Sequence, residues 1–397
     1  MKMIVSWIAI SLVLVPMTCR AENPTAALKV GVVLSMTGAQ ARFGEIQRNS
    51  FLLAVDEINK AGGVNGRQVA IIVEDDNGQP DLAGSAAEKL ISEDGVLVLT
   101  GASRSEAGWA IAAVAEQKKV PFLITSGCVD EITEQGWEYV FRIGPPLSHY
   151  FGPLLSFLEK VVNPQTLALV CENSLFGREA ANRFAKAFQK TGGKIVAREI
   201  FQIGSTDFRP MLIKVRNSKP DVVFMCSLPI EGALLMRQSQ ELNLTPKIFA
   251  GTAQGFTISQ FMLVAGGASD HVFSVDLWSP RLPYAGAQKY FDDYVLRFLS
   301  STDYHGAQAY ACMQVIADAF NRTPSLTPSG VRQALTATDT QTVFGPVRFV
   351  SEGKMTQQNS VRTFLSQWLG GTLEIVWPKE FASEQYVYPI PPWSSGP

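Results

Sequence analysis

From Leu28 onward, short apolar runs alternate with segments whose apolar residues recur at helical spacing. The first five runs are LKVGVVL, RQVAIIVE, GVLVLTG, VPFLITS and YVFRIG, and helices are predicted between them, for example at 46–60 and 80–93. Nearly continuous Val, Ile and Leu are typical of strands covered on both faces, which indicates a parallel sheet. Strand and helix in alternation predict a doubly wound α/β lobe.

The pattern stops near RIGPPLSHYFGP and then begins again. The second set of predicted strands is TLALVCE, GKIVAREIF, PDVVFMCS, PKIFAGT and HVFSVDLW, with helices at 177–191, 208–217 and 230–242. We therefore expect a second α/β lobe that repeats the architecture of the first without repeating its sequence. After Trp278 we expect two more helices, a short helix near 331–337, and a tail of β structure that crosses between the lobes.

The first 21 residues have a different character. Lys2 precedes an apolar run that is too short to cross a bilayer comfortably, and small residues stand at Cys19 and Ala21. This pattern predicts a secretory signal peptide that is cleaved near Ala21, with full release of the exported chain. A membrane anchor or a lipid-modified Cys19 is the alternative, although Pro16–Thr18 fit a lipoprotein cleavage motif poorly.

Length and composition agree with two ordinary domains. The chain has 397 residues, 46% of them hydrophobic and 18% charged, and a formal net charge of −2. These values exclude a disordered chain. Lysine and arginine are dispersed, which argues against a nucleic-acid-binding protein. No other stretch is long and apolar enough to cross a membrane, so we expect the mature chain to be a soluble monomer.

Four cysteines follow the predicted cleavage site, at positions 128, 171, 226 and 312. They are far apart and form no CxxC or zinc-finger spacing. Cys171 and Cys226 each end an apolar run, so small buried thiols are favoured over a disulfide. Whether these two residues pair stays open.

Motifs of catalytic chemistry are missing from the sequence. It contains no GxSxG, GxxxxGK[ST], GxGxxG or HExxH, and the three histidines are scattered. The acidic turn EDDNG resembles only the start of a calcium loop. We therefore expect a binding protein without enzymatic activity, metal or cofactor. A secreted hydrolase is the rival interpretation.

Hydroxyl groups and glycines gather where the predicted strands end. The segments are LSMTGAQARFG, LTGASRSEAG and LITSGCVDEIT, and they place Ser103, Ser105, Ser126 and Gly127 in loops that lead into helices. In doubly wound sheets ligands bind beyond the carboxyl ends of strands, where helix N–H groups point at them. This arrangement suits a carboxylate or another small dipolar group. The alternative is that the serines only cap helices.

These segments also carry a family resemblance. VGVVLSMTGAQARFG, AVDEINKAGGVNGRQVAIIVEDD, VLTGASRS, VPFLITSG and YVFRIGPP resemble the type I periplasmic binding proteins, above all the branched-chain amino-acid-binding components of ABC importers. GPVRFVSEGK and the C-terminal WPKEFASEQYVYPIPPW resemble that family's tail. The resemblance implies two lobes joined by three crossings, a Venus flytrap that closes on a small molecule and docks on the permease and ATPase subunits of an importer.

The resemblance also implies ligand contacts. By correspondence with relatives, the contacts in the first lobe fall on Ser105, Gly127, Val129 and Phe43. Those in the second lobe fall on Phe176, Leu228 and Ala253–Gln254, and a late helix contributes His305.

Several of these positions depart from the amino-acid-binding pattern. Relatives often carry a threonine at Val129, an acid for the ligand ammonium near Ala253–Gln254, and tyrosines at Phe176 and Leu228. Without that acid, a ligand amine loses a charge-assisted hydrogen bond. We therefore expect an acid or amide with an apolar body to bind at least as well as leucine; an aromatic or aliphatic acid, urea or another amide are the alternatives.

Three acids near predicted strand ends or crossings offer a substitute for the missing one. They are Glu172, Glu231 and Asp276.

The resemblance fixes expected boundaries as well. Lobe 1 is predicted to comprise 28–143 and 276–345, and lobe 2 to comprise 144–275 and 346–397. Hinges are expected near 143–146, 274–277 and 345–348. A ligand sensor of the same fold is the rival within the binding class.

Overall fold

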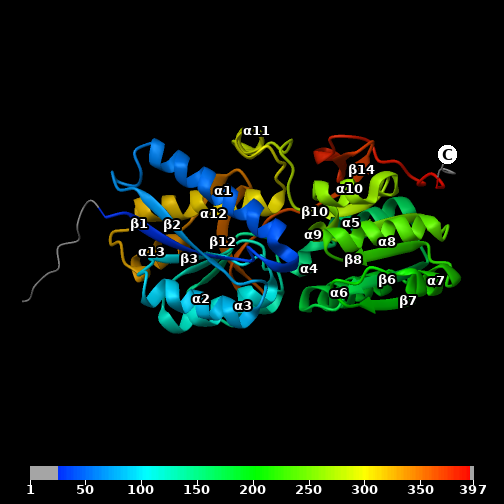
Figure 1. Ribbon diagram of the computed structural model, residues 1–397, viewed down its shortest axis with the longest axis horizontal. Helices are drawn as coiled ribbons and strands as arrows, with labels where there is room; N and C mark the ends of the chain where they lie inside the picture. Colours follow the sequence, from blue (N-terminus) through cyan, green and yellow to red (C-terminus); the bar gives the residue numbers. More distant parts are fainter. Residues whose placement is uncertain (1–25, 394–397) are drawn as a thin grey trace, which may run out of the picture.

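The computed structural model describes residues 26–393. The predicted signal peptide and Cys19 lie outside these residues. Figure 1 shows two lobes side by side along the long axis of the molecule, each built around its own sheet. Among the described residues, no helix has both the length and the apolar character that a membrane span requires.

The sheet of lobe 1 has eight strands within the described range, in the order β11-β12-β13-β5-β4-β3-β1-β2. Strands β1 to β5 are parallel neighbours, and β13 pairs parallel to β5, whereas β12 runs antiparallel to both β11 and β13. The bounds are β1 Leu28–Leu34, β2 Val69–Asp75, β3 Val98–Gly101, β4 Phe122–Ile124, β5 Val140–Arg142, β11 Asp339–Thr342, β12 Gly345–Glu352 and β13 Met355–Asn359.

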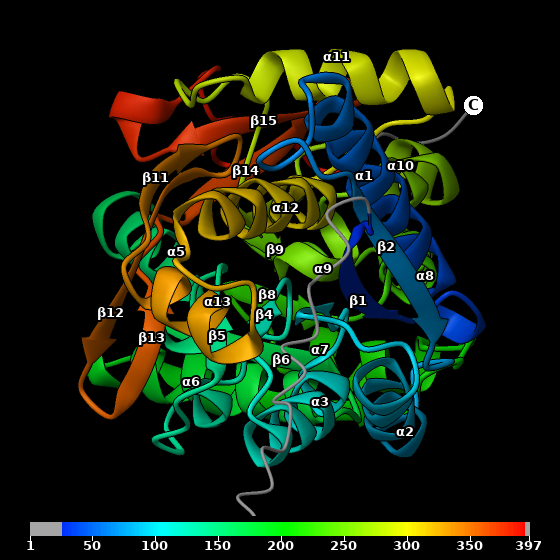
Figure 2. The ribbon, with the colours of Figure 1, turned by 90° about the vertical axis from the view of Figure 1, so that its left-hand side faces the viewer.

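Helices cover both faces of this sheet. Figure 2 shows α1 and α12 on one side and α2 and α3 on the other, and each pair is in contact. The helices of lobe 1 are α1 Ala41–Lys60, α2 Pro80–Ser92, α3 Ser105–Lys118, α11 Ala287–Phe298, α12 Tyr304–Arg322 and α13 Pro328–Thr336, with 3-10 turns at Gly38–Gln40 and Asp130–Ile132. Helix α1 begins five residues before its predicted start, and the side chain at its N-cap, Gln40, makes no capping hydrogen bond that would mark this start in the sequence.

The sheet of lobe 2 has seven strands among the described residues, in the order β15-β14-β10-β9-β8-β6-β7. The bounds are β6 Thr166–Glu172, β7 Lys194–Phe201, β8 Val222–Cys226, β9 Ile248–Gly251, β10 Phe273–Asp276, β14 Phe364–Leu369 and β15 Thr372–Trp377. The helices are α4 Leu147–Tyr150, α5 Gly152–Phe157, a π turn at Leu158–Val162, α6 Leu175–Lys190, α7 Arg209–Asn217, α8 Pro229–Glu241, α9 Ala253–Phe256 and α10 Ser259–Ala265, with 3-10 turns at Gly266–Ser269 and Lys379–Phe381.

The chain crosses between the two sheets three times: after β5, after β10 and after β13. The predicted crossing near 345–348 is wrong, because β12 and β13 both belong to the first sheet and the crossing follows Asn359. The two polar residues that end β13 hold this hairpin on the edge of β5. Buried Gln358 accepts a hydrogen bond from Arg142 Nε at 2.6 Å, and Asn359 Nδ2 donates to the carbonyl of Ile143 at 3.0 Å. The apolar pattern alone does not reveal such pairing.

Candidate ligand-binding site

One small cavity lies between the two lobes, at the carboxyl ends of parallel strands. Lobe 1 lines it with Ser103, Arg104, Ser105, Glu106, Ser126 and Cys128, and lobe 2 lines it with Glu172, Phe176 and Gln254. Its volume of about 10 Å³ leaves room for about one water molecule. Five of the predicted contact residues therefore lie around one space, and the two lobes are closed against each other there.

Gly101 gives the serine loop its shape at the end of β3. Its φ of +116° is a conformation that other residues rarely adopt, and a Cβ there would lie 2.2 Å from the carbonyl oxygen of Val33. The backbone can thus pass close to β1 before it turns into α3. This turn places Ser103 and Ser105 at the interlobe cavity.

The serine hydroxyls around the cavity are held in place by lobe 1. Ser105, which is 3% exposed, accepts hydrogen bonds from the backbone N–H groups of Cys128 and Val129 at 3.2 and 3.3 Å. Ser103 accepts from Gln47 Nε2 at 3.0 Å, and Ser126 donates to Gln308 Oε1 at 2.8 Å. Ser105 does not cap α3. It joins the serine loop to the loop that contains Gly127.

Val129 lies beside the cavity without lining it. Its side chain is buried in the apolar cluster between the first sheet and α3. Its backbone contributes to the structure of the loop, because its N–H donates to Ser105 and its carbonyl accepts from Arg142 at 2.7 Å.

An ion pair occupies the centre of the interlobe contact. Arg104 donates to the carboxylate of Glu106 from Nε at 3.3 Å and from Nη2 at 3.2 Å. Glu106 also accepts from the backbone N–H of Leu175, at the start of α6 in lobe 2, at 3.0 Å. Burial alone would raise the pKa of Glu106, but the charge and hydrogen bond of Arg104 lower it below its ordinary value. Sequence reasoning missed both residues, since a charged pair two positions apart is common on protein surfaces.

Glu172 lines the same cavity from lobe 2, at the end of β6. It is 1% exposed, and its Oε1 accepts from the hydroxyl of Ser174 at 2.7 Å. Ser174 in turn caps α6 by accepting from the N–H of Gly177 at 2.9 Å. The second carboxylate oxygen of Glu172 is buried and has no hydrogen-bond partner. Burial raises the pKa of Glu172 to about 7, against the opposing effects of Ser174 and Arg104.

The other two acids that the sequence offered lie elsewhere. Glu231 accepts from the N–H of Gly204 at 2.9 Å. Asp276 lines a different interlobe cavity of about 440 Å³, together with Arg42 and Trp278 among others. Its oxygens accept from the N–H groups of Leu277 and Trp278 and from Ser366, and burial raises its pKa to about 7.

The remaining predicted contacts form an apolar group between the lobes. Phe43 of α1 packs in one cluster with Leu228 and Ile258 of lobe 2. The ring of His305 lies over that of Phe43, with centroids 4.4 Å apart, and its Nδ1 is 2.8 Å from the carboxylate of Asp303. Phe43, Leu228 and His305 therefore lie together, but they do not line the cavity at Ser105.

A further polar contact holds the lobes together. Arg183 of α6 pairs with Asp130 at 3.0 Å and with Glu131 at 2.9 Å, and both acids lie in the turn after β4. Ser301 of lobe 1 also donates to Ser259 of lobe 2, at 3.1 Å.

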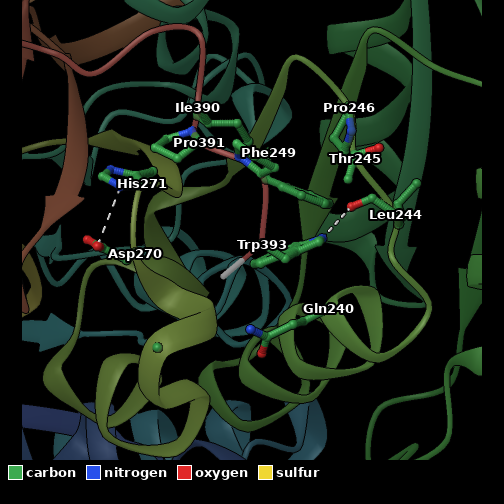
Figure 3. A pocket seen from close by; sticks show the side chains of 12 residues that line it. Gln240, Leu244, Thr245, Pro246, Phe249, Asp270, His271, Ile390, Pro391 and Trp393 are labelled. Atoms are coloured by element: carbon green, nitrogen blue, oxygen red, sulfur yellow. Dashed lines mark hydrogen bonds and ion pairs between the residues drawn. The ribbon is translucent and has the colours of Figure 1, made fainter. Parts of the chain in front are cut away.

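Figure 3 shows a cavity of about 330 Å³ that lies wholly on lobe 2. The C-terminal segment forms one wall, where Trp393 Nε1 donates to the carbonyl of Leu244 at 2.8 Å. His271 and Asp270 stand at the other side. This cavity contains none of the predicted contact residues.

The four cysteines in the described residues are buried and unpaired. Cys171 and Cys226 are neighbours in register on β6 and β8. Both are free, buried thiols at the carboxyl ends of these two strands.

Residues 27–371 match the family model of the periplasmic binding proteins. The chain belongs to this family. One relative of this binding protein is the leucine-, isoleucine-, valine-, threonine- and alanine-binding protein of Pseudomonas aeruginosa, which is 27% identical over 335 residues that cover 83% of this chain and 87% of the relative.

Two solved structures share the fold. The branched-chain amino acid transporter substrate binding protein LivJ of Streptococcus pneumoniae, in complex with isoleucine, has a TM-score of 0.80 and 22% identity and covers 88% of this chain and 98% of its own. A solute binding protein of an ABC transporter from Rhodopseudomonas palustris, in complex with 3,4-dihydroxybenzoic acid, has a TM-score of 0.76 and 23% identity over 87% of this chain and 95% of its own. The predicted fold, two doubly wound lobes of a type I periplasmic binding protein, is confirmed.

Proposed function

We propose that this chain is an exported solute-binding protein that captures a small carboxylate-bearing molecule between its lobes. It delivers that molecule to the permease and ATPase subunits of an ABC importer, and no chemical step takes place. The single observation that carries the proposal is the cavity that both lobes line at the carboxyl ends of parallel strands. Family membership and the named relatives supply the transport context.

The carboxylate of the ligand is assigned to the wall formed by lobe 1. The hydroxyls of Ser103, Ser105 and Ser126 lie there, and each retains capacity for another hydrogen bond. Arg104 lies beside them, in its ion pair with Glu106. Three hydroxyl groups suit a carboxylate that leaves water, because hydrogen bonds to a charged group are roughly twice as strong as neutral ones.

Capture requires the lobes to separate. A cavity of about 10 Å³ admits no amino acid, so the ligand binds an open form and the lobes then rotate together about the three crossings. The ligand stabilises the closed form through its contacts to both walls. The Arg183 ion pairs and the Phe43 cluster break on opening and form again on closure.

An aromatic acid is the second candidate ligand. Phe176 lines the cavity where the amino-acid-binding pattern has a tyrosine, so this wall has one hydroxyl group fewer, and the carboxamide of Gln254 lines the cavity as well. The Rhodopseudomonas palustris relative in complex with 3,4-dihydroxybenzoic acid supports a ligand of this class in the same fold.

A thermal-shift screen of amino acids, amides, and aliphatic and aromatic acids tests the proposal. We expect at least one small carboxylate to raise the melting temperature, because a ligand at 100 times its Kd stabilises the folded state by about 2.7 kcal/mol. Absence of a shift with every compound at millimolar concentration would contradict a role in capturing such solutes.

A further inference from the structure

The interlobe cavity contains three charged side chains, and only one of them lacks a partner of opposite charge. Arg104 and Glu106 neutralise each other through two hydrogen bonds. Glu172 receives one hydrogen bond, from a neutral hydroxyl, and its Oε2 has none. A buried carboxylate oxygen without a donor is costly, so this position calls for a group that donates hydrogen bonds and carries positive charge.

We infer that Glu172 binds the ammonium group of the ligand, in place of the acid that is missing at Ala253–Gln254, so that this binding protein selects amino acids over the corresponding simple acids. The inference rests on the proposed function, since it assigns a residue within the same cavity. It changes the expectation from sequence that a ligand without an amine binds at least as well as leucine.

The positions of the walls support this assignment. Glu172 belongs to lobe 2, whereas the serine hydroxyls belong to lobe 1, and all of them line one space. A molecule with a carboxylate at one end and an ammonium beside it therefore contacts both lobes at once. An acid that lacks the ammonium contacts the serine wall alone and leaves Glu172 unpaired on closure.

Among the described charged and titratable groups around Glu172, Arg104 is the one cation that acts on it. Arg104 of the serine loop attracts it, while Glu106 of α3 and Glu231 of α8 repel it. On the adjacent strand, the buried Cys226 thiol also interacts with its charge. Because Arg104 is already bonded to Glu106, a positively charged ligand is the remaining source of a partner.

The protonation of Glu172 provides a signature of this contact. Burial raises its pKa to about 7, so part of the ligand-free molecules carry a proton there at neutral pH. An ammonium group favours the carboxylate and lowers the pKa, so binding at pH 7 releases protons. The affinity for an amino acid then falls by about tenfold per pH unit well below pH 7 and levels off above pH 8.

The experiment screens the twenty standard L-amino acids, each beside its deaminated analogue, such as leucine beside 4-methylpentanoate. Titration calorimetry of the best pair follows, in two pH 7 buffers of different ionisation enthalpy, on the wild type, Glu172→Gln and Glu231→Gln. The second variant is a matched control, because Glu231 is a buried acid nearby that does not line the cavity.

We expect the wild type to bind the amino acid at least tenfold more tightly than its analogue and to release protons on binding at pH 7. In E172Q, affinity for the amino acid should fall by about 10- to 100-fold, the size of one charged hydrogen bond, and proton release should vanish. E231Q should behave like the wild type. The proton count on the wild type needs no variant, so the test survives if E172Q fails to fold.

Five results would overturn the assignment. Equal affinity of the wild type for the amino acid and its analogue would reject it while leaving the proposed function intact, and so would unchanged amino-acid affinity or proton release in E172Q. Binding of analogues alone would have the same meaning. If no amino acid and no acid binds the wild type, the proposed function itself fails and the assignment falls with it.

Discussion

Replacing Arg183 by alanine should shift this protein toward its open form. Arg183 of α6 lies on lobe 2 and has three acidic partners. Glu179, at 3.6 Å, lies on the same helix, whereas Asp130 and Glu131 lie on lobe 1, so these two ion pairs exist only when the lobes are together. Asp130 is 4% exposed and keeps a hydrogen bond from the N–H of Ser148 at 3.0 Å, whereas the side chain of Glu131 is 41% exposed.

The magnitude follows from these exposures. The pair with the buried Asp130 is worth about 1 kcal/mol and the exposed pair with Glu131 about 0.3 kcal/mol, after screening by solvent. Their sum corresponds to a factor of about 5 to 15 in the equilibrium between closed and open forms. Ligand affinity should fall by up to the same factor, because the ligand stabilises the closed form and the full factor applies when the ligand-free protein is mostly open.

Calorimetry with the ligand found in the screen measures the affinity, and small-angle scattering of the ligand-free protein measures its radius of gyration. Arg178→Ala is the matched control, since Arg178 lies on the same helix and bonds only Asn173 of its own lobe, at 2.6 Å. Unchanged affinity in R183A, or an equal loss in R178A, would refute the view that this contact holds the lobes closed.

The remaining predictions concern binding, closure, export and pH. Ser105→Leu should abolish binding and destabilise the fold by about 2–6 kcal/mol, because two buried N–H groups lose their acceptor; retained affinity by calorimetry would contradict a role at the site. Saturating ligand should reduce the radius of gyration of a mixed open and closed population without changing the oligomeric state, which scattering and light scattering can check. N-terminal sequencing of exported protein should start at Glu22, and a lipid-modified first residue at Cys19 would refute this. Burial raises the pKa of Asp276 from 3.8 to about 7, so its proton is held more tightly in the folded state, and stability should decline as pH rises from about 4 to about 7. Urea unfolding should show that the free energy of unfolding declines less with pH in Asp276→Asn than in the wild type. An identical pH profile in the variant would contradict a contribution of Asp276 to this decline.

The strands and helices were predictable because both lobes are built from parallel strands with continuous apolar runs. The hairpin β12–β13 was not, since its place in the first sheet depends on Gln358 and Asn359, polar residues that are buried only through hydrogen bonds with a distant strand. Periodicity carries no record of such partners.

The candidate site divides in the same way. The position of the serines at strand ends could be predicted from the sequence, and Ser103, Ser105 and Ser126 line one cavity in the structure. The role of Arg104 and Glu106 depends on how closely α6 of the other lobe approaches, which no local pattern contains. Glu172 carried one signal in the sequence, an acid that directly follows the apolar run TLALVC, yet only the fold separates it from Glu231 and Asp276.

The most direct test of the account is the crystal structure of the complex with the amino acid that binds best in the screen. We expect the ligand between the lobes, with its carboxylate on Ser105 and the adjoining loop and its ammonium within about 3 Å of Glu172. A ligand bound outside the cleft, for example beside Trp393 on lobe 2, with the interlobe cavity still closed and empty, would contradict the account.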